Sequence, residues 1–272
     1  MERVVRVFIF LIFYLNGMAQ THQEGLATGY FTPGAYTNHF EEVFSFTSNP
    51  ACLAGATHLL CGAFTENKWM LQSLNSYMLA VAFGLGGGGC GIALYRNGDA
   101  DYNEQSITIG YGKHLGKLDI GIEFEYQQDR AAGYESIRFI SSGTGIRYQV
   151  NEKMFFGCEL GLPLSGMTGK INPERAPLFY RMGFGYNLMS DVSLTGQIEK
   201  QSGQPLTISG YLQYRYSDHF SFLFGINNVS TLSFRTGWKK NGLNIQLCLL
   251  FEPLLGFSPA LAVLWENQNK KE

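Results

Sequence analysis

The segment from Leu118 to Tyr126 alternates in character at every position, and this constrains the fold more than any other feature of the sequence. One set of alternate positions carries Leu118, Ile120, Ile122, Phe124 and Tyr126, and the other carries Asp119, Gly121, Glu123 and Glu125. Successive side chains of a β-strand point to opposite faces, so the segment is predicted to form a strand with one apolar and one polar face. On a helix, the same carboxylates would be scattered around the cylinder. The chain is therefore expected to build a sheet that separates apolar surroundings from polar ones.

The same two-faced pattern recurs along most of the chain and predicts about fourteen strands. They are expected near residues 57–66, 75–85, 88–96, 105–114, 117–127, 136–149, 153–162, 178–188, 191–200, 205–216, 219–227, 230–239, 243–251 and 256–266. Their lengths suit tilted strands that cross a membrane with about 9–11 residues each. We therefore expect an all-β fold, a transmembrane antiparallel β-barrel of about 14 strands over residues 57–266, with an N-terminal plug segment before it.

The predicted connections are alternately tight and long. Tight ones include Gly86-Gly87, Leu115-Gly116 and Lys240-Asn241-Gly242, whereas the longer ones are 67–74, 97–104, 128–135, 163–177 and 201–204. Outer-membrane barrels have short periplasmic turns and longer extracellular loops. The tight turns are therefore expected on the periplasmic side.

Aromatic residues gather on the apolar side of the strands, beside the tight turns. They are Tyr111, Tyr148, Tyr186, Tyr216, Phe220, Trp238 and Trp265. Such barrels carry aromatic girdles at the membrane interfaces, where a ring with an apolar body and a polar edge is favoured. A soluble β-sandwich or a lipocalin-like fold is the alternative, but neither has a reason to band its aromatic residues. The banding favours the membrane barrel, with these residues as a periplasmic girdle.

The composition agrees with a barrel and excludes two other classes of protein. The chain has 272 residues, a formal net charge of -2 and a mean hydropathy of -0.05. This hydropathy is too low for a bundle of membrane helices but ordinary for strands that alternate between lipid and lumen. The net charge gives no electrostatic reason to expect a nucleic-acid partner.

The N-terminus has the parts of a signal peptide. Arg3 and Arg6 precede a short apolar run, and small residues precede a cleavage site predicted after Ala19. The apolar run has about nine residues, whereas a membrane helix needs roughly 20, so a signal peptide over residues 1–19 is favoured over a membrane anchor. At the other end, the polar tail 267–272 is expected in the periplasm.

Residues 20–56 do not show the alternation of the strands. Pro50 suits the first turn of a short helix, and Asn49 is a suitable cap for that helix. We expect the segment to be a plug inside the barrel or a lid on its periplasmic mouth. The candidate plug or gate residues are Asn49, Pro50, Ala51, Leu53 and Gly55.

Charged residues are predicted to lie on the inward face of the barrel. They are Asp119, Glu123, Glu125, Arg138, Arg147, Glu159, Arg181, Glu199, Arg215 and Arg235. Mixed charges could line an aqueous path, but we favour structural ion pairs across the wall, with Glu125 and Arg138 as possible cross-strand partners. The many inward glycines leave space for a plug or a ligand.

No motif in the sequence indicates catalysis, a metal or a cofactor. The five histidines show no metal-ligand spacing, and the five cysteines include no CxxC pair. The odd number of cysteines excludes complete intramolecular pairing, and Cys52 with Cys61 is the pair that sequence proximity suggests. Ser106 and His114 share a predicted strand but lie at its opposite ends, so we expect no enzyme.

Two short motifs carry a family resemblance. Asn49-Pro50-Ala51-Cys52-Leu53-Ala54 resembles the N-P-A-G-L-A element before the first strand of FadL-like and PorV/PorQ-like outer-membrane proteins, with Cys52 in place of the usual glycine. The segment 253–259 looks like the P-x-L-G-F-S-P element of small Bacteroidota barrels related to PorV and PorQ. The resemblance implies a barrel of fourteen strands whose N-terminal segment folds into it.

Three functions are compatible with these observations and with the resemblance. The first is passive transport or binding of a small apolar molecule, gated by residues 20–56. The second, implied by the PorV/PorQ resemblance, is a docking role in protein export by type IX secretion. The third is a structural barrel whose loops contact surface partners. The expected location is the outer membrane of a Gram-negative bacterium, and the expected partners are its lipids with a small apolar ligand or secretion-system proteins.

Overall fold

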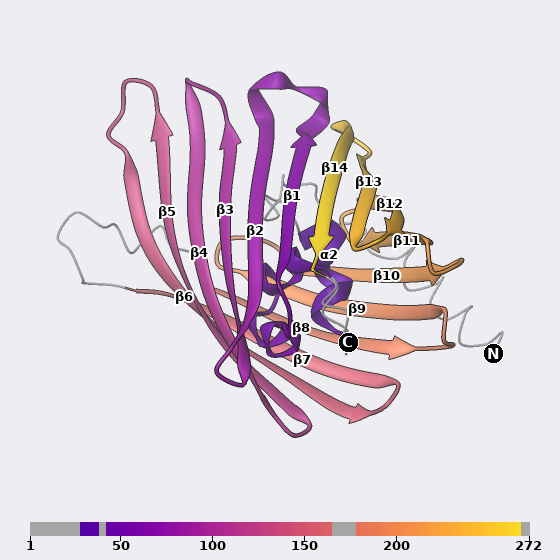
Figure 1. The fold of residues 1–272 in the computed structure, drawn as a ribbon. Coiled ribbons are helices and arrows are strands. Elements are labelled where there is room, and N and C mark those ends of the chain that lie inside the picture. Colours follow the sequence, from indigo (N-terminus) through magenta and orange to yellow (C-terminus); the bar gives the residue numbers. More distant parts are fainter. Residues whose placement is uncertain (1–27, 38–41, 165–177, 268–272) are drawn as a thin grey trace.

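The computed structural model describes residues 28–37, 42–164 and 178–267 of the chain. Within these residues, fourteen antiparallel strands follow one another around a closed barrel, and β1 pairs with β14 to close it (Figure 1). The strands are β1 (Leu60–Asn67), β2 (Asn75–Leu85), β3 (Gly88–Gly98), β4 (Tyr102–Leu115), β5 (Leu118–Ala131), β6 (Ile137–Asn151), β7 (Met154–Pro163), β8 (Phe179–Asn187), β9 (Val192–Gln201), β10 (Thr207–Arg215), β11 (Phe220–Asn227), β12 (Leu232–Lys240), β13 (Leu243–Glu252) and β14 (Gly256–Glu266). The predicted all-β barrel of about fourteen strands is confirmed. The predicted signal peptide and residues 268–272 of the predicted tail lie outside the described residues.

The strands begin and end close to the predicted positions, but two of the long loops are shorter than expected. β5 continues to Ala131, so residues 132–136 alone connect it to β6, and residues 99–101 alone connect β3 to β4. The two-residue turns lie at the other end of the barrel. In one of them, Asn241 and Gly242 have φ values of 52° and 80°, which are typical of the type I′ turns that join antiparallel strands.

The side chains of β5 show how the wall separates two surroundings. Ile122 and Phe124 point outward and are exposed, whereas Asp119 and Glu123 point inward and are buried. The outward positions beside the short turns carry the aromatic residues Tyr111, Tyr148, Tyr186, Tyr216, Phe220, Trp238 and Trp265, most of them exposed. At β5 the wall is therefore apolar outside and polar inside, the reverse of a soluble protein.

The N-terminal segment lies inside the barrel and contributes no strand to its wall (Figure 1). It contains helix α2 (Thr28–Ala35) and two 3₁₀ helices, η1 (Val43–Thr47) and η2 (Pro50–Gly55). We call its described residues, 28–37 and 42–56, the plug. Of the two sequence-based alternatives, the structure therefore has a plug within the lumen and not a lid across its mouth. Among the described residues, no helix is both long and apolar enough to span a membrane.

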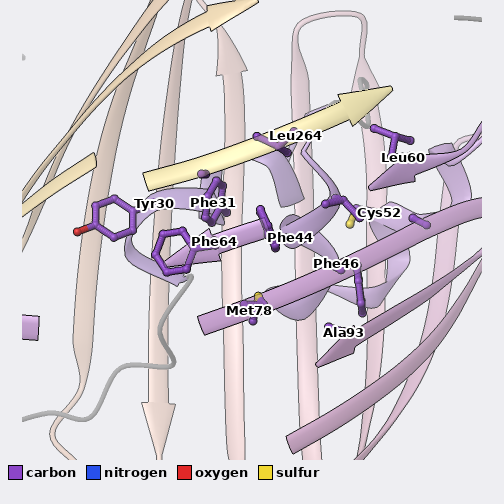
Figure 2. Packing of buried hydrophobic residues seen from close by; sticks show 14 of the residues in the cluster. Tyr30, Phe31, Phe44, Phe46, Cys52, Leu60, Phe64, Met78, Ala93 and Leu264 are labelled. Carbon is purple, nitrogen blue, oxygen red and sulfur yellow. The ribbon is translucent and has the colours of Figure 1, made fainter. Parts of the chain in front are cut away.

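The hydrophobic core sits in the lumen, between the plug and one side of the wall. Phe31 and Phe44 of the plug pack against Phe64 of β1, with ring centroids 5.7 and 6.1 Å from the Phe64 ring (Figure 2). Leu264 of β14 and Ala93 of β3 belong to the same buried cluster. The plug thus contacts both strands that meet where the barrel closes.

Candidate functional site

The plug fits against inward glycines of the wall. A Cβ added to Gly121 of β5 would lie 2.3 Å from the carbonyl carbon of Pro50, and one added to Gly145 of β6 would lie 2.1 Å from Oδ1 of Asn49. Real Cβ atoms do not approach other atoms so closely. The absence of side chains at these positions lets the plug backbone lie directly on the strands.

The Asn49-Pro50 turn is fixed both to the plug and to the wall. Oδ1 of Asn49 accepts a hydrogen bond from the Ala51 amide (3.0 Å), and Pro50 takes the first position of η2, as the sequence predicts. Nδ2 of Asn49 donates to the Ile146 carbonyl of β6 (3.2 Å). The predicted plug residues Asn49, Pro50, Ala51 and Leu53 are fully buried, and Gly55 is half-buried. This turn is one of the points where the plug backbone lies directly against the strands.

Three inward arginines reach from the wall to main-chain carbonyls of the plug. Arg147 on β6 donates to the carbonyl of Thr37 and pairs with Asp119 Oδ2 (2.6 Å). Asp119 Oδ1 lies 2.5 Å from Nδ1 of the exposed His114. Because Arg147 is buried, its charge depends on this carboxylate for compensation.

Arg181 on β8 forms the second contact. Its Nη1 lies 2.9 Å from Glu159 Oε2 and donates to the Thr47 carbonyl (3.2 Å), while its Nε lies 3.1 Å from Glu199 Oε2. One guanidinium is thus shared by carboxylates of β7 and β9, the two strands beside it. This arrangement is the structural ion pairing across the wall that the sequence suggests.

Arg235 on β12 forms the third contact. Its Nη2 lies 2.7 Å from Oε1 of Glu42, and its Nη1 donates to the Tyr30 carbonyl (3.0 Å). The guanidinium also lies 5.6 Å from the centroid of the Phe31 ring. The carboxylate here comes from the plug, whereas the partners of the other two arginines come from the wall.

Arg138 does not belong to the lumen, so this part of the prediction is wrong. Its side chain is exposed on the outward parity of β6, where Phe139 and Ser141 point inward. The register places Arg138 opposite Gln128 and Glu125 opposite Ser141, so the expected pair of Glu125 with Arg138 does not form. Arg138 is the second residue of β6, so it lies near the rim, where a long charged side chain can point outward and still reach water.

The remaining predicted lumen residues divide into buried and exposed ones. Glu123 is buried, and its Oε2 has no hydrogen-bond partner among the described residues. Glu125 is half-buried and accepts a hydrogen bond from Ser141 Oγ (3.5 Å). Arg215 is the last residue of β10 and is exposed beside a turn, so it does not reach the packed interior.

The aromatic residues of the plug are functional candidates that the sequence reasoning did not single out. Tyr36 is fully buried and donates from its hydroxyl to Oε1 of Gln197 on β9 (3.0 Å), and burial raises the pKa of this hydroxyl. Tyr30 is also fully buried and donates to the Ser258 carbonyl (3.3 Å). The concentration of aromatic residues in a segment without strand alternation was the available signal.

All five cysteines are free thiols, so the disulfide considered between Cys52 and Cys61 does not form. Cys52 lies within η2 and is fully buried, and burial raises its pKa to about 12. In the described part of the chain, no group of three or more His, Cys, Asp or Glu side chains is placed to hold a metal ion.

A large apolar hollow lies on the outside of the wall. It has a volume of about 1490 Å³ and is lined by residues of β6 to β14. Met182 and Phe224 line it and are exposed on outward positions, whereas the side chains of Gln197 and Tyr211 point inward and are buried. Its exposed lining therefore belongs to the outer surface, and the inward side chains behind it are packed.

The fold and the filled lumen define a class, the plugged antiparallel β-barrels. The structure is similar to the Pseudomonas putida toluene transporter TodX, with a TM-score of 0.58 and 9% identity over 91% of this chain and 94% of that chain. It is also similar to a deltaS2 mutant of the TodX monoaromatic hydrocarbon channel (TM-score 0.60, 10% identity, 88% and 98% covered). A third similar structure is the Acinetobacter baumannii outer membrane protein Omp33 (TM-score 0.53, 5% identity, 77% and 98% covered). No protein-family model and no curated protein matches the sequence. At these identities, the likeness is one of fold.

Proposed function

We propose that this protein is an integral outer-membrane β-barrel that binds or passively passes small apolar molecules and whose lumen is closed at rest by the plug. The observation that carries the proposal is that the plug is buried in the lumen and packed against the wall without adding a strand to it. All fourteen strands pair with one another, so the plug can leave without breaking a hydrogen bond between strands. The barrel can therefore open by movement of one segment.

The outer surface supports placement in a membrane. Exposed apolar side chains cover the outward positions of the strands, and aromatic residues stand beside the short turns. Such a surface is unfavourable in water but suits lipid, with the short turns toward the periplasm. The proposal includes export by a signal peptide cleaved after Ala19, with membrane lipids as partners.

The class of substrate is proposed from fold similarity and from the packed lumen. TodX is described as a toluene transporter and a monoaromatic hydrocarbon channel, and its fold is shared here. The wall residues that pack against the plug on β1 and β14 are apolar, among them Leu60, Phe64 and Leu264, so a molecule that replaced the plug would meet apolar surface on that side of the lumen. The proposal is for a non-catalytic barrel; Ser106 and His114, the pair considered for catalysis, lie apart on β4.

Two measurements test this function. The purified protein and a variant lacking residues 20–56 are inserted into planar lipid bilayers, where the variant is expected to show a stable ionic conductance that the full-length protein lacks. Gram-negative cells that express the full-length protein should take up radiolabelled toluene faster than cells that express an unrelated barrel. Background conductance in both forms, together with uptake equal to the control, would contradict the proposal.

A docking barrel for protein export is the second candidate, and exposed apolar side chains on the longer loops favour it. Met70 and Leu71 after β1, and Leu254 before β14, are exposed at that rim. In this role, which the PorV/PorQ resemblance implies, nothing needs to pass through the lumen. Crosslinking in cells, followed by mass spectrometry, should then recover a secretion component, and deletion should impair secretion. Unchanged secretion without a crosslinked partner would exclude the docking role.

A further inference from the structure

We infer that the ion pair between Arg235 and Glu42 is the latch that keeps the plug in the lumen, whereas Arg147 and Arg181 only shape its seat. The inference rests on the proposed role of the plug as a movable gate, and it names the contact that must break for the gate to open. Its test below measures movement of the plug directly and does not depend on what the barrel transports.

The three arginines resemble one another in their contact with the plug backbone. Each donates a hydrogen bond to a main-chain carbonyl of the plug, at Tyr30, Thr37 and Thr47. These bonds replace hydrogen bonds to water that the arginines and carbonyls would make in an open barrel. Such an exchange contributes little net stability, because the bonds to water that it replaces are of similar strength.

The arginines differ in where their counter-charges lie. Asp119 pairs with Arg147, and Glu159 and Glu199 pair with Arg181, and all three carboxylates are on the wall. These pairs survive when the plug leaves. Among the described residues, the carboxylate that pairs with Arg235 is Glu42, on the plug itself, so this pair separates on opening.

Burial makes the Arg235–Glu42 pair sensitive to the loss of one partner. Both side chains are buried, and removal of one partner of a buried pair leaves an uncompensated charge in a medium of low polarity. In the open state both groups would be hydrated, so the same removal has little effect there. A neutral residue at position 42 should therefore shift the equilibrium toward the open state.

The latch also has a feature that keeps it reversible. Oε2 of Glu42 is buried and has no hydrogen-bond partner among the described residues. Water would satisfy this oxygen on opening, which offsets part of the attraction to Arg235. The closed state is therefore favoured by the pair without being locked by it.

Cys52 provides a reporter of plug movement that is already in the chain. Its thiol is fully buried within η2, so a maleimide can reach it only when the plug moves. Cys61, Cys90 and Cys158 are partly exposed and are replaced by serine in the test protein. Peptide mass spectrometry separates labelling at Cys52 from labelling at Cys248, which is also buried.

The test compares maleimide labelling rates at Cys52 in folded protein, with gel mobility as the check of folding. Glu42→Gln should raise the rate at least tenfold, equivalent to about 1.4 kcal/mol. Glu159→Gln is the matched control, because Arg181 keeps Glu199, and it should change the rate less than twofold. The double variant Glu42→Gln with Arg235→Gln should label more slowly than Glu42→Gln, since no buried charge then remains unpaired, but faster than the wild type, because the latch itself is absent.

Two results would overturn the inference. One is an unchanged rate in folded Glu42→Gln, and the other is an equal acceleration by Glu159→Gln. A faster rate in Glu42→Gln alone, together with background hydrocarbon uptake, would support the latch and contradict the proposed transport. The two proposals therefore fail separately.

Discussion

Some inward glycines of this wall, Gly121 and Gly145 among them, lie directly beneath the plug. Glycine usually weakens a strand, because it has high backbone entropy and no side chain to pack. At Gly121 and Gly145, the missing side-chain volume is filled by the backbone and side chains of Asn49, Pro50 and Ala51. The cost to the strand is thus offset by contacts with a segment distant in sequence.

The close contact of the plug with Gly121 predicts that alanine lowers the stability there but not at a glycine without such a contact. Gly121→Ala should lower the stability of the folded barrel by about 1–3 kcal/mol, because the new methyl group meets the Pro50 and Ala51 backbone. Gly210→Ala, at an outward position of β10, is the control, since a Cβ at Gly210 has no heavy atom within 4 Å, and its effect should stay within about 0.5 kcal/mol. Urea unfolding in lipid vesicles measures both. Equal effects would show that the plug does not restrict Gly121.

At the scale of the element, β5 tests which face of the wall meets lipid. Ile122→Arg places a charge on an outward position in the middle of the strand and should destabilise the barrel by about 2–4 kcal/mol. Glu123→Gln, the next residue, points inward and keeps its shape while removing a buried charge, so it should be tolerated. Folding into detergent, followed by the difference in gel mobility between folded and heated samples, compares them. Equal tolerance of both variants would refute the assigned faces.

The strands could be predicted because their signal is local. Alternation within each segment located all fourteen, and the inward positions of Glu159 and Arg181 follow from the same pattern. The error at Arg138 arose because charge was taken to mean inward. That rule holds only where the outward side meets lipid, and Arg138 is the second residue of β6, away from the middle of the wall.

The position of the plug could not be predicted from the sequence, because its contacts are not local. The Asn49-Pro50 turn was visible as a motif, but its seat is the Ile146 carbonyl of β6. Glu42 was visible as one of two adjacent acidic residues in an aromatic run, but its partner Arg235 is near the other end of the chain. The alternation of side chains along a segment does not show which distant residues pair. The sequence therefore could not decide between a plug in the lumen and a lid on its mouth.

The whole molecule makes a prediction about depth in the membrane. Trp238 and Trp265 lie on outward positions beside short turns, at one rim of the barrel. Trp69, the third tryptophan, lies at the opposite end, in the connection after β1. The test protein carries Trp69→Phe, so that only the other two tryptophans fluoresce. Fluorescence of the two remaining tryptophans should be quenched more by lipids brominated close to the headgroup than by lipids brominated at the chain end. The reverse order would place this rim at the bilayer centre and contradict the girdle.

The contact of the plug with both β1 and β14 has a consequence for biogenesis. The barrel closes where β1 pairs with β14, with Leu60 opposite Glu266. Because these strands lie at opposite ends of the sequence, bringing them together has a large entropic cost. Phe44 of the plug is tethered just before β1, and the cluster around it includes Leu264 of β14. The last strand to be synthesised therefore meets an apolar surface that is already in place. We expect closure of the wall and sealing of the lumen to be one event, so that a nascent barrel never leaks.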